Sequence, residues 1–208
     1  MPASKRSLSG RSLVHGVGVN DADYDVHIRK NIKTVWRCPF YVKWKQMLRR
    51  CYYPLWHKKY PTYIGCSVCP EWHYFSKFRL WMENQKWEGM ALDKDLLVRG
   101  NQVYSPDTCC FIPGAINALF ASGEKKKNLH LPEGVTLTRN GKYIVQVKIR
   151  PGIIYYKTLP TIKESHIHSL EKKIEAVQYG AHDPRLEVKA ILALGGRIHE
   201  IQESIKVI

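Results

Sequence analysis

The residues with the clearest capacity for chemistry lie within positions 91–120. Asp93 and Asp95 bring carboxylates, and Asn117 brings an amide from a run whose apolar residues are spaced as in a helix. Carboxylate and amide oxygens are hard donors that suit Mg²⁺ or a similar divalent cation and leave positions for water and a phosphate. The stretch therefore predicts a cation site, provided that its elements bring Asp93 beside Asn117.

Three short elements are expected to position these side chains. Residues 91–97 alternate as a strand does, and residues 108–112 are a second β-prone run. Turn-forming residues at 100–101 and 105–107 lie between the two runs, and residues 114–121 have helical apolar spacing. The predicted order is strand, loop, strand, helix.

The charge balance predicts an anionic partner. The 208-residue chain has 33 Lys and Arg against 18 Asp and Glu, a formal net charge of +15, which favours nucleic acid. With 44% hydrophobic and 25% charged residues, the composition is that of a globular protein. No apolar run approaches the ~20 residues of a membrane span, and the N-terminus lacks the apolar core of a secretory signal. An intracellular protein that does not bind membranes is expected.

The cysteines leave two alternatives open. Cys66 and Cys69 form a C-x-x-C pair, which is half of a structural zinc site, and Cys109 or Cys110 completes it if the fold brings them near. Without an export signal the thiols are expected to be reduced. They are then either zinc ligands or buried free thiols.

Apolar spacing predicts two helices on either side of an aromatic loop. The first runs from about Phe40 to Cys51, and the second covers residues 71–85, whose aromatic stripe is expected in the core. The loop, residues 52–65, carries tyrosines and prolines beside cations, and such rings either stack on bases or cover the edge of a core. Residues 1–35 are polar and basic and are expected to form a flexible arm.

A charged linker over residues 124–130 is expected to precede a second unit. Three antiparallel strands backed by a helix are predicted there, and one face of such a sheet can lie in a major groove or simply be solvated. The strands are expected over residues 134–138, 143–149 and 153–159, and the helices over 163–179 and 184–194. The cations expected to contact DNA along the chain are Lys43, Arg49, Arg50, Lys58, Lys59, Arg99, Arg139, Lys142, Lys148 and Arg150.

The run from Trp44 to Asn117 resembles the HNH-type homing endonucleases of bacteriophages, through the motifs WKQMLRRCY, YPTYIGCSVCPEW and LDKDLLVRGNQVYSPDTCCFIPGAIN. Residues 131–179 resemble the AP2-like DNA-binding module that often follows that nuclease domain. The resemblance implies an α+β fold. A ββα-metal nuclease domain with flanking helices is expected over residues 36–123, and an AP2-like domain with a C-terminal helix over residues 131–208.

The resemblance also implies a reaction, the cleavage of DNA with a single divalent ion. In that family an acid on the first strand and a residue on the helix hold the metal, which stabilises the scissile phosphate and the departing oxygen. Asp93 and Asn117 match those positions, which makes them the expected metal ligands.

Lys94 stands where the family has the histidine that accepts a proton from the attacking water. A histidine suits that role because its pKa is about 6.5, whereas an ordinary lysine, with a pKa of about 10.4, does not. Lys94 is expected instead to hold the phosphate. Water activation is then left to the metal, to Asp95, or to His57 or His73.

Two functions follow from these residues. The first is a metal-dependent DNA endonuclease that nicks double-stranded DNA, acting in the bacterial cytoplasm if the chain is of phage origin. The second is an HNH-fold protein that binds DNA and has lost its chemistry. An RNA-binding zinc module built on Cys66, Cys69 and the aromatic loop is a third reading.

Overall fold

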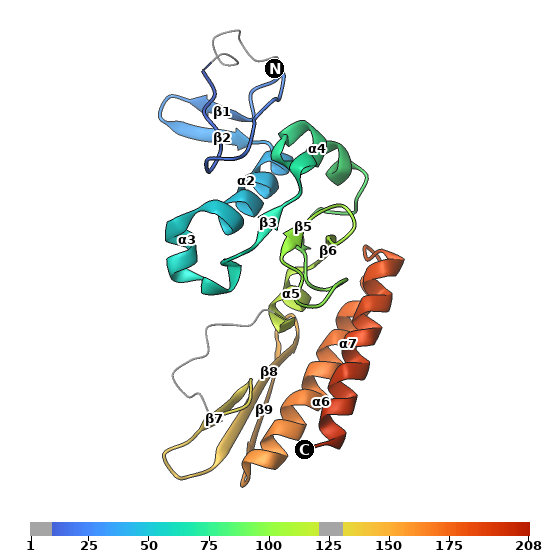
Figure 1. The fold of residues 1–208 in the computed structure, drawn as a ribbon. Helices are drawn as coiled ribbons and strands as arrows, with labels where there is room; N and C mark the ends of the chain where they lie inside the picture. The colour runs from blue at the N-terminus through green and yellow to red at the C-terminus, as the bar shows by residue number, and fades with distance from the viewer. Residues whose placement is uncertain (1–9, 121–130) are drawn as a thin grey trace.

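The computed structural model describes residues 10–120 and 131–208 (Figure 1). It confirms the expected α+β class, since helices and small sheets alternate along the chain. Figure 1 shows an elongated molecule with a two-stranded hairpin at one end, a three-stranded sheet at the other, and two antiparallel helices along one side. The predicted linker over residues 124–130 lies outside the described residues.

The N-terminal segment packs onto the rest of the protein, so the flexible arm expected over residues 1–35 is wrong from residue 10 onward. Strands β1 (His27–Lys30) and β2 (Lys33–Arg37) form an antiparallel hairpin. Ala22 and Val26, which precede the hairpin, are buried in the main core. These apolar side chains, together with backbone hydrogen bonds between Val19 and both His73 and Phe75, attach a segment that is otherwise polar.

Helix α2 (Pro39–Tyr52) is the amphipathic helix expected from the sequence. It begins at Pro39, where the missing N–H leaves no helical hydrogen bond unmade. Trp44 and Leu48 are fully buried on its inner face. A Cβ on Gly18 would lie 2.3 Å from Leu48 Cδ1, so the N-terminal segment crosses this helix at a distance that only glycine allows.

The segment expected to be an aromatic loop, residues 52–65, contains two short helices instead. These are α3 (Pro54–Lys59) and the 3₁₀ helix η1 (Pro61–Tyr63). Each begins at a proline, because the fixed φ of proline suits the first position of a helix. The same prolines that suggested a loop are therefore helix starts here.

The helix expected over residues 71–85 is divided into the 3₁₀ helix η2 (Pro70–His73) and helix α4 (Phe75–Glu83). Tyr74 between them is extended, with φ −90° and ψ 125°. Val19 causes this interruption, because its N–H donates to the last carbonyl of η2 at 2.8 Å and its carbonyl accepts from the first N–H of α4 at 3.0 Å. Backbone hydrogen bonds to a distant segment thus interrupt the single helix that the apolar periodicity predicted.

The strand, loop, strand, helix order predicted around the acidic residues is confirmed. Strand β4 (Met90–Asp93) pairs antiparallel with β6 (Cys110–Pro113), with the last residue of β4 opposite the first residue of β6. Helix α5 (Gly114–Phe120) follows directly. Strands β3 (Ser67–Val68) and β5 (Val103–Tyr104) form a short parallel pair.

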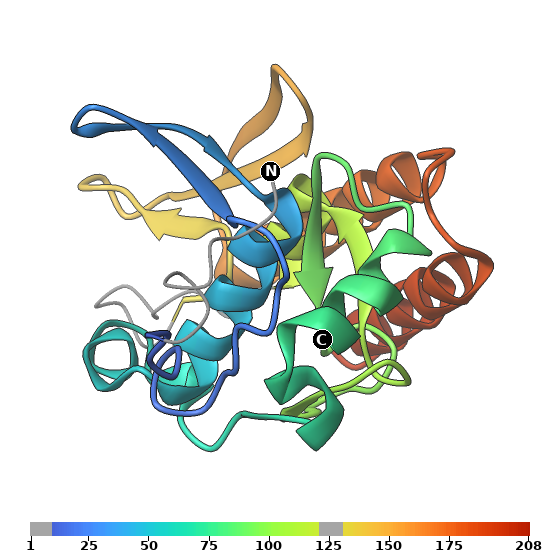
Figure 2. The same ribbon diagram turned by 90° about the horizontal axis from the view of Figure 1, so that it is seen from above.

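The C-terminal part has the three predicted strands, β7 (Val135–Leu137), β8 (Tyr143–Arg150) and β9 (Ile153–Leu159), all antiparallel. Helix α6 (Ile162–Ala181) covers one face of the sheet, and α7 (Val188–Lys206) lies beside α6 (Figure 2). The expected end of the last helix at residue 194 is wrong, because α7 continues through a glycine pair. Helix packing on α6 offsets the roughly 1 kcal/mol that each glycine costs.

The domain boundary expected between residues 36–123 and 131–208 separates the core of the three-stranded sheet from the main core. It does not separate α6 and α7 from the main core. The sheet has a small core of its own, centred on Val145. Val177 of α6 and Leu194 of α7 belong instead to the main core around the ββα unit, which consists of β4, β6 and α5. Among the described residues, none of these helices is long and apolar enough to cross a membrane.

Candidate functional site

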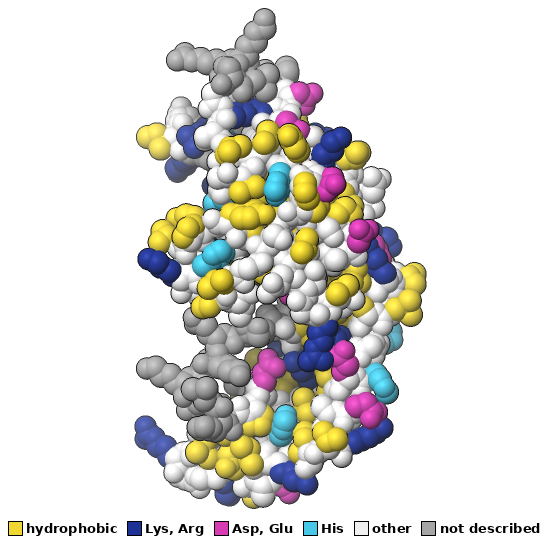
Figure 3. Space-filling model, in the orientation of Figure 1, with side chains coloured by type: hydrophobic (Ala, Val, Ile, Leu, Met, Phe, Trp, Pro, Cys, Tyr) yellow, Lys and Arg dark blue, Asp and Glu magenta, His cyan; other side chains and the backbone are white. Residues whose placement is uncertain are grey.

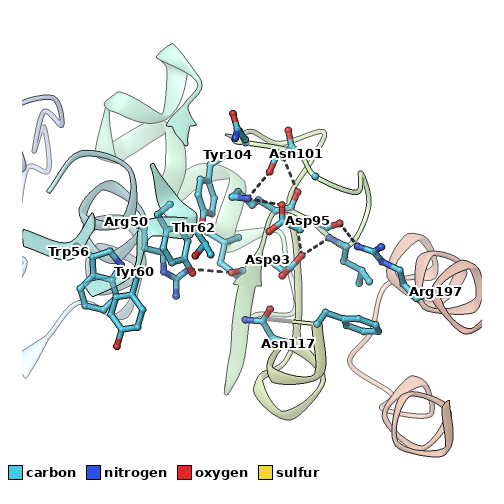
Figure 4. Close-up of a pocket in the computed structure, with 17 residues that line it drawn as sticks. Arg50, Trp56, Tyr60, Thr62, Asp93, Asp95, Asn101, Tyr104, Asn117 and Arg197 are labelled. Carbon is cyan, nitrogen blue, oxygen red and sulfur yellow. Dashed lines mark hydrogen bonds and ion pairs between the residues drawn. The ribbon is translucent and has the colours of Figure 1, made fainter. Parts of the chain in front are cut away.

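A cavity of about 720 Å³ opens between the ββα unit, α3 and the last helix (Figure 4). Seven elements contribute to its wall, including η1 through Tyr63 and β5 through Tyr104. Arg50 comes from α2, Trp56 from α3, Asp93 from β4, Asn117 from α5 and Arg197 from α7. The two predicted cation ligands therefore line the same cavity, although they lie on different elements.

Asp93 ends β4, and its carboxylate is held by the loop that follows. Asp93 Oδ1 accepts the backbone N–H groups of Asp95 at 2.8 Å and Leu96 at 2.6 Å. Burial raises the pKa of the Asp93 carboxyl group, and these two N–H donors oppose part of that rise. Within residues 10–120 and 131–208, Oδ2 of Asp93 and the amide of Asn117 form no hydrogen bond. Figure 4 shows both side chains facing the cavity.

Lys94 lines the cavity, but its ammonium is bound by the loop that follows β4. Its side chain is buried, with 6% of the residue exposed. Nζ donates to Asp95 Oδ1 and to the backbone oxygen of Asn101, both at 2.6 Å. Both contacts tie the loop after β4 to itself, and the phosphate role expected for Lys94 stays a prediction.

Asn101 completes that loop with three further hydrogen bonds. Its Nδ2 donates to the backbone oxygens of Lys94 at 2.8 Å and Val103 at 2.7 Å, and its Oδ1 accepts from the N–H of Val103 at 3.1 Å. The sequence signalled Asn101 only as a turn residue. Together with Lys94, it fixes the backbone that carries Asp93 and Asp95.

Asp95 is less free to act as a base than the sequence suggested. Its Oδ1 is paired with the Lys94 ammonium at 2.6 Å, and its backbone oxygen accepts from Arg197 Nη2 at 3.1 Å. The carboxylate remains half-exposed. Asp95 therefore helps to hold the loop, while part of its side chain remains open to solvent.

Neither histidine considered for water activation lines the cavity. His57 Nε2 is 2.8 Å from the backbone oxygen of Arg50, and His73 Nε2 is 3.4 Å from the hydroxyl of Tyr52. The described residues that form the cavity wall include no histidine. Activation of water by an imidazole is thus not supported by this part of the chain.

Two arginines give the cavity its positive charge. Arg50 Nη1 lies 3.5 Å from the backbone oxygen of Leu92. Burial by itself lowers the pKa of Arg50, but Tyr104, Tyr63 and Asp93 outweigh it and the pKa is raised, so the guanidinium stays charged. Arg50 was predicted as a DNA contact, and the structure places it at the cavity.

Arg197 was missed from the sequence, because the last helix was expected to end before it. Its side chain is 14% exposed, and Nη1 pairs with Glu200 at 3.2 Å. The signal that would have found it is the apolar periodicity, which continues beyond Gly196 to Ile198 and Ile201 at helical spacing.

The other predicted DNA-binding cations fall into two groups. Some have partners within the protein: Lys43 Nζ donates to the backbone oxygen of Met90, and the exposed Arg99 pairs with Glu200 at 3.0 Å. Arg49 lies with its Cζ 4.0 Å from the ring centroid of Trp56. The remaining ones are exposed: Lys58, Lys59, Arg139, Lys142, Lys148 and Arg150.

The exposed group includes four cations around the three-stranded sheet, remote from the cavity. Lys148 is exposed on β8 and lines a small cavity together with His166 and Lys173 of α6. Arg139 and Lys142 belong to the turn between β7 and β8, where the Thr138 N–H donates to the Lys142 carbonyl at 2.8 Å. These cations carry the same two alternatives, DNA contact or solvated surface, that the sequence left open.

The cysteines are buried or half-buried free thiols. Burial raises the pKa of Cys110 to about 12, and burial also raises the pKa of Cys66 and Cys69. In the described parts of the chain, no group of three or more His, Cys, Asp or Glu side chains is placed to hold a metal ion. Zinc ligation by these thiols stays a prediction from spacing.

The geometry thus brings the Asp93 carboxylate, the Asn117 amide and the guanidinium groups of Arg50 and Arg197 to one cavity. Its structural loop, held by Lys94 and Asn101, was not apparent from residue types. Comparison of the chain with protein-family models, with curated proteins and with solved structures found no match.

Proposed function

We propose that this protein is a metal-dependent DNA endonuclease of the HNH type that nicks double-stranded DNA. The observation that carries the proposal is the convergence of Asp93, from β4, and Asn117, from α5, on one cavity. Both side chains keep an oxygen without a partner among the described residues. A net charge of +15 supports DNA as the substrate.

The donor set fits a small divalent cation such as Mg²⁺. Mg²⁺ is usually bound through one or two protein oxygens, with water and substrate phosphate completing the coordination. Asp93 Oδ2 and Asn117 Oδ1 would be those protein ligands. When bound, such an ion stabilises the charge that develops on the scissile phosphate and lowers the pKa of a bound water.

The chain's own residues account for substrate binding in this proposal. Arg50 and Arg197 place guanidinium groups at the cavity wall, where they offset the charge of a phosphodiester. Trp56 and Tyr60, whose ring centroids are 4.4 Å apart, form an aromatic wall of the same cavity. A nucleobase next to the scissile phosphate can stack there.

A DNA-binding protein without nuclease activity is the second candidate, and a specific observation favours it. Asp93 Oδ1 serves as the acceptor of a turn, and Lys94 is buried where the family has its histidine. Those contacts explain the residues by loop stability alone. The two candidates differ in whether the protein cleaves DNA when a divalent cation is supplied.

Cleavage of supercoiled plasmid separates the two candidates. The wild-type protein is expected to produce nicked circles with Mg²⁺ or Mn²⁺ and none with EDTA. Asp93→Asn keeps the turn acceptor and removes the charge, so it should reduce the rate by ~100-fold or more while DNA affinity persists. Asp107→Asn, an exposed aspartate outside the cavity, is the matched control and should cleave normally.

The outcomes assign the function directly. Loss of nicking in Asp93→Asn and in Asn117→Ala, with Asp107→Asn active, supports the nuclease. Salt-sensitive DNA binding without nicking in any divalent ion supports the binding protein. Equal nicking by wild type and Asp93→Asn removes the proposed site.

A further inference from the structure

A second cavity, of about 370 Å³, lies between the β1–β2 hairpin and α2. On α2 its wall is formed by Tyr41, Val42, Lys45, Gln46 and Arg49. The last four positions follow the i, i+3, i+4, i+7 spacing of one helix stripe, so they share a face. Arg49 therefore faces this cleft, while its neighbour Arg50 lines the candidate active cavity.

The hairpin provides the opposite wall through matched positions on its two strands. The register pairs His27 with Arg37 and Arg29 with Thr34, and residues directly opposite in a hairpin lie on the same face. All four line the cleft. The hairpin thus turns two arginines toward the two cations of α2.

The ionised side chains that line the cleft in the described structure are all cations. Arg29, Arg37, Lys45 and Arg49 all contribute, and no Asp or Glu is among the described residues that form its wall. None of the four is among the ion pairs found within residues 10–120 and 131–208. Four like charges held together in this way favour an anionic ligand.

Two buried nitrogens in the wall also lack a partner. Arg49 Nε and His15 Nε2 are inaccessible to solvent and form no hydrogen bond within the described structure, and both residues line the cleft. A buried polar group without a partner is destabilising, and an acceptor oxygen would satisfy a donor of this kind. Burial, together with Lys45 and Arg49, lowers the pKa of His15, so the imidazole is neutral and offers a single N–H.

The cleft is connected to the candidate active cavity by side chains in contact. The Arg49 guanidinium lies 4.0 Å from the centroid of the Trp56 ring, and the centroids of Trp56 and Tyr60 are 4.4 Å apart, with the two rings tilted by 38°. Both rings line the candidate active cavity. A DNA strand that leaves the candidate active cavity along these two rings therefore reaches the cleft.

We propose that the cleft between the β1–β2 hairpin and α2 binds backbone phosphates of the DNA whose neighbouring segment occupies the candidate active cavity. This inference rests on the proposed function. Guanidinium groups suit phosphate because their paired N–H donors match its oxygens.

The shape of the hairpin favours a polymer over a free anion. It projects from the end of the molecule, and hydrophobic and basic side chains gather at its tip (Figure 3). Ile32 at the turn is 98% exposed, and Lys30 and Lys33 on either side are exposed as well. A two-stranded ribbon of this width fits a major groove of DNA, so its tip can engage the duplex while its base holds the phosphates.

The salt dependence of DNA binding tests this inference. Affinity for a labelled duplex is measured in EDTA, so that no cleavage occurs, from about 50 to 200 mM salt. Removal of one phosphate contact is expected to make the slope of log K against log salt less steep by ~0.9. Lys45→Gln and Arg37→Gln, which are both exposed, should each show this change, and their combination about twice as much. Lys77→Gln, an exposed lysine on α4, removes the same charge and should leave the slope unchanged.

Further measurements distinguish failure of this inference from failure of the proposed function. Asp93→Asn should abolish nicking without changing the slope, so loss of the nuclease proposal and loss of the cleft proposal give different results. The cleft proposal is overturned if Lys45→Gln and Arg37→Gln show the same salt slope as Lys77→Gln. It is also overturned if the wild-type protein binds no duplex. Competition by inorganic phosphate, beyond that of chloride at equal ionic strength, would assign the cleft to a free anion and overturn its assignment to DNA.

Discussion

Arg197 of α7 donates from Nη2 to the backbone oxygen of Asp95 at 3.1 Å, across 102 positions of sequence. The last helix thereby holds the loop that follows the candidate metal ligand Asp93. Arg197 Nε is also buried without a hydrogen-bond partner in the described structure, at the wall of the same cavity. The C-terminal helices are therefore part of the candidate site, and do not only support the sheet.

Arg197→Ala should lower both stability and nicking. It removes a charged hydrogen bond to a half-buried carbonyl, which is worth about 1.5–3 kcal/mol, and a guanidinium beside the substrate phosphate. Urea unfolding and plasmid nicking measure the two effects. Lys206→Ala removes an exposed ion pair to Glu203 on the same helix and should change stability by no more than about 0.5 kcal/mol. Equal stability of the two variants would contradict the role of Arg197.

Gly180→Ala should destabilise the contact between α6 and α5. A Cβ there would lie 2.0 Å from Ile116 Cδ1, which forces the Ile116 side chain or one of the helices to shift at a cost of about 1–3 kcal/mol. In α7, a Cβ on Gly195 would meet no atom within 4 Å, so Gly195→Ala should stabilise by roughly 0.5–1 kcal/mol through helix propensity. Thermal unfolding of the pair should show opposite signs. A destabilised Gly195→Ala would mean that α7 does not continue through the glycines.

Lys94 and Arg50 should respond differently to replacement by methionine. Lys94 is buried and bound to its own loop, so Lys94→Met should cost about 1–2 kcal/mol of stability and leave the salt dependence of DNA binding unchanged. Arg50 lines the cavity, so Arg50→Met should reduce the salt slope by ~0.9. Urea unfolding and duplex titrations report both quantities. A reduced slope in Lys94→Met would support the phosphate role expected from the sequence.

The stability difference between wild type and Asp93→Asn should depend on pH. Burial raises the pKa of Asp93 in the folded state, so folding favours the protonated acid. The wild type should therefore lose stability relative to Asp93→Asn as pH rises from about 4 through that raised pKa, and the difference should level off above it. Urea unfolding between about pH 4 and pH 8 measures this trend. A wild type that gains stability over the variant with rising pH would show that the folded state favours the charged form.

Local sequence signals predicted the elements that depend on short-range chemistry. The ββα unit, α2 and the three strands of the sheet follow from apolar periodicity and turn residues, and β9 has the expected bounds. Prolines were misread over residues 52–65, since Pro54 and Pro61 begin helices there. A proline alone does not distinguish a loop from a helix start.

Features that depend on long-range contacts were not apparent from the sequence. Tyr74 interrupts a helical pattern because Val19 pairs with the backbone on either side of it. Lys94 resembled a phosphate ligand by position, but burial beside Asp95 and Asn101 gives it a structural role. Such outcomes depend on which distant segments meet, and residue types do not encode that locally.

The central claim is that Asp93 and Asn117 hold one divalent cation in a shared cavity. Anomalous diffraction from crystals soaked in Mn²⁺ tests it most directly. The account predicts one peak at roughly 2.0–2.2 Å from both Asp93 Oδ2 and Asn117 Oδ1, and no such peak in Asp93→Asn crystals. A peak at other side chains, or Mn²⁺-soaked crystals in which these two side chains hold no ion, would contradict it.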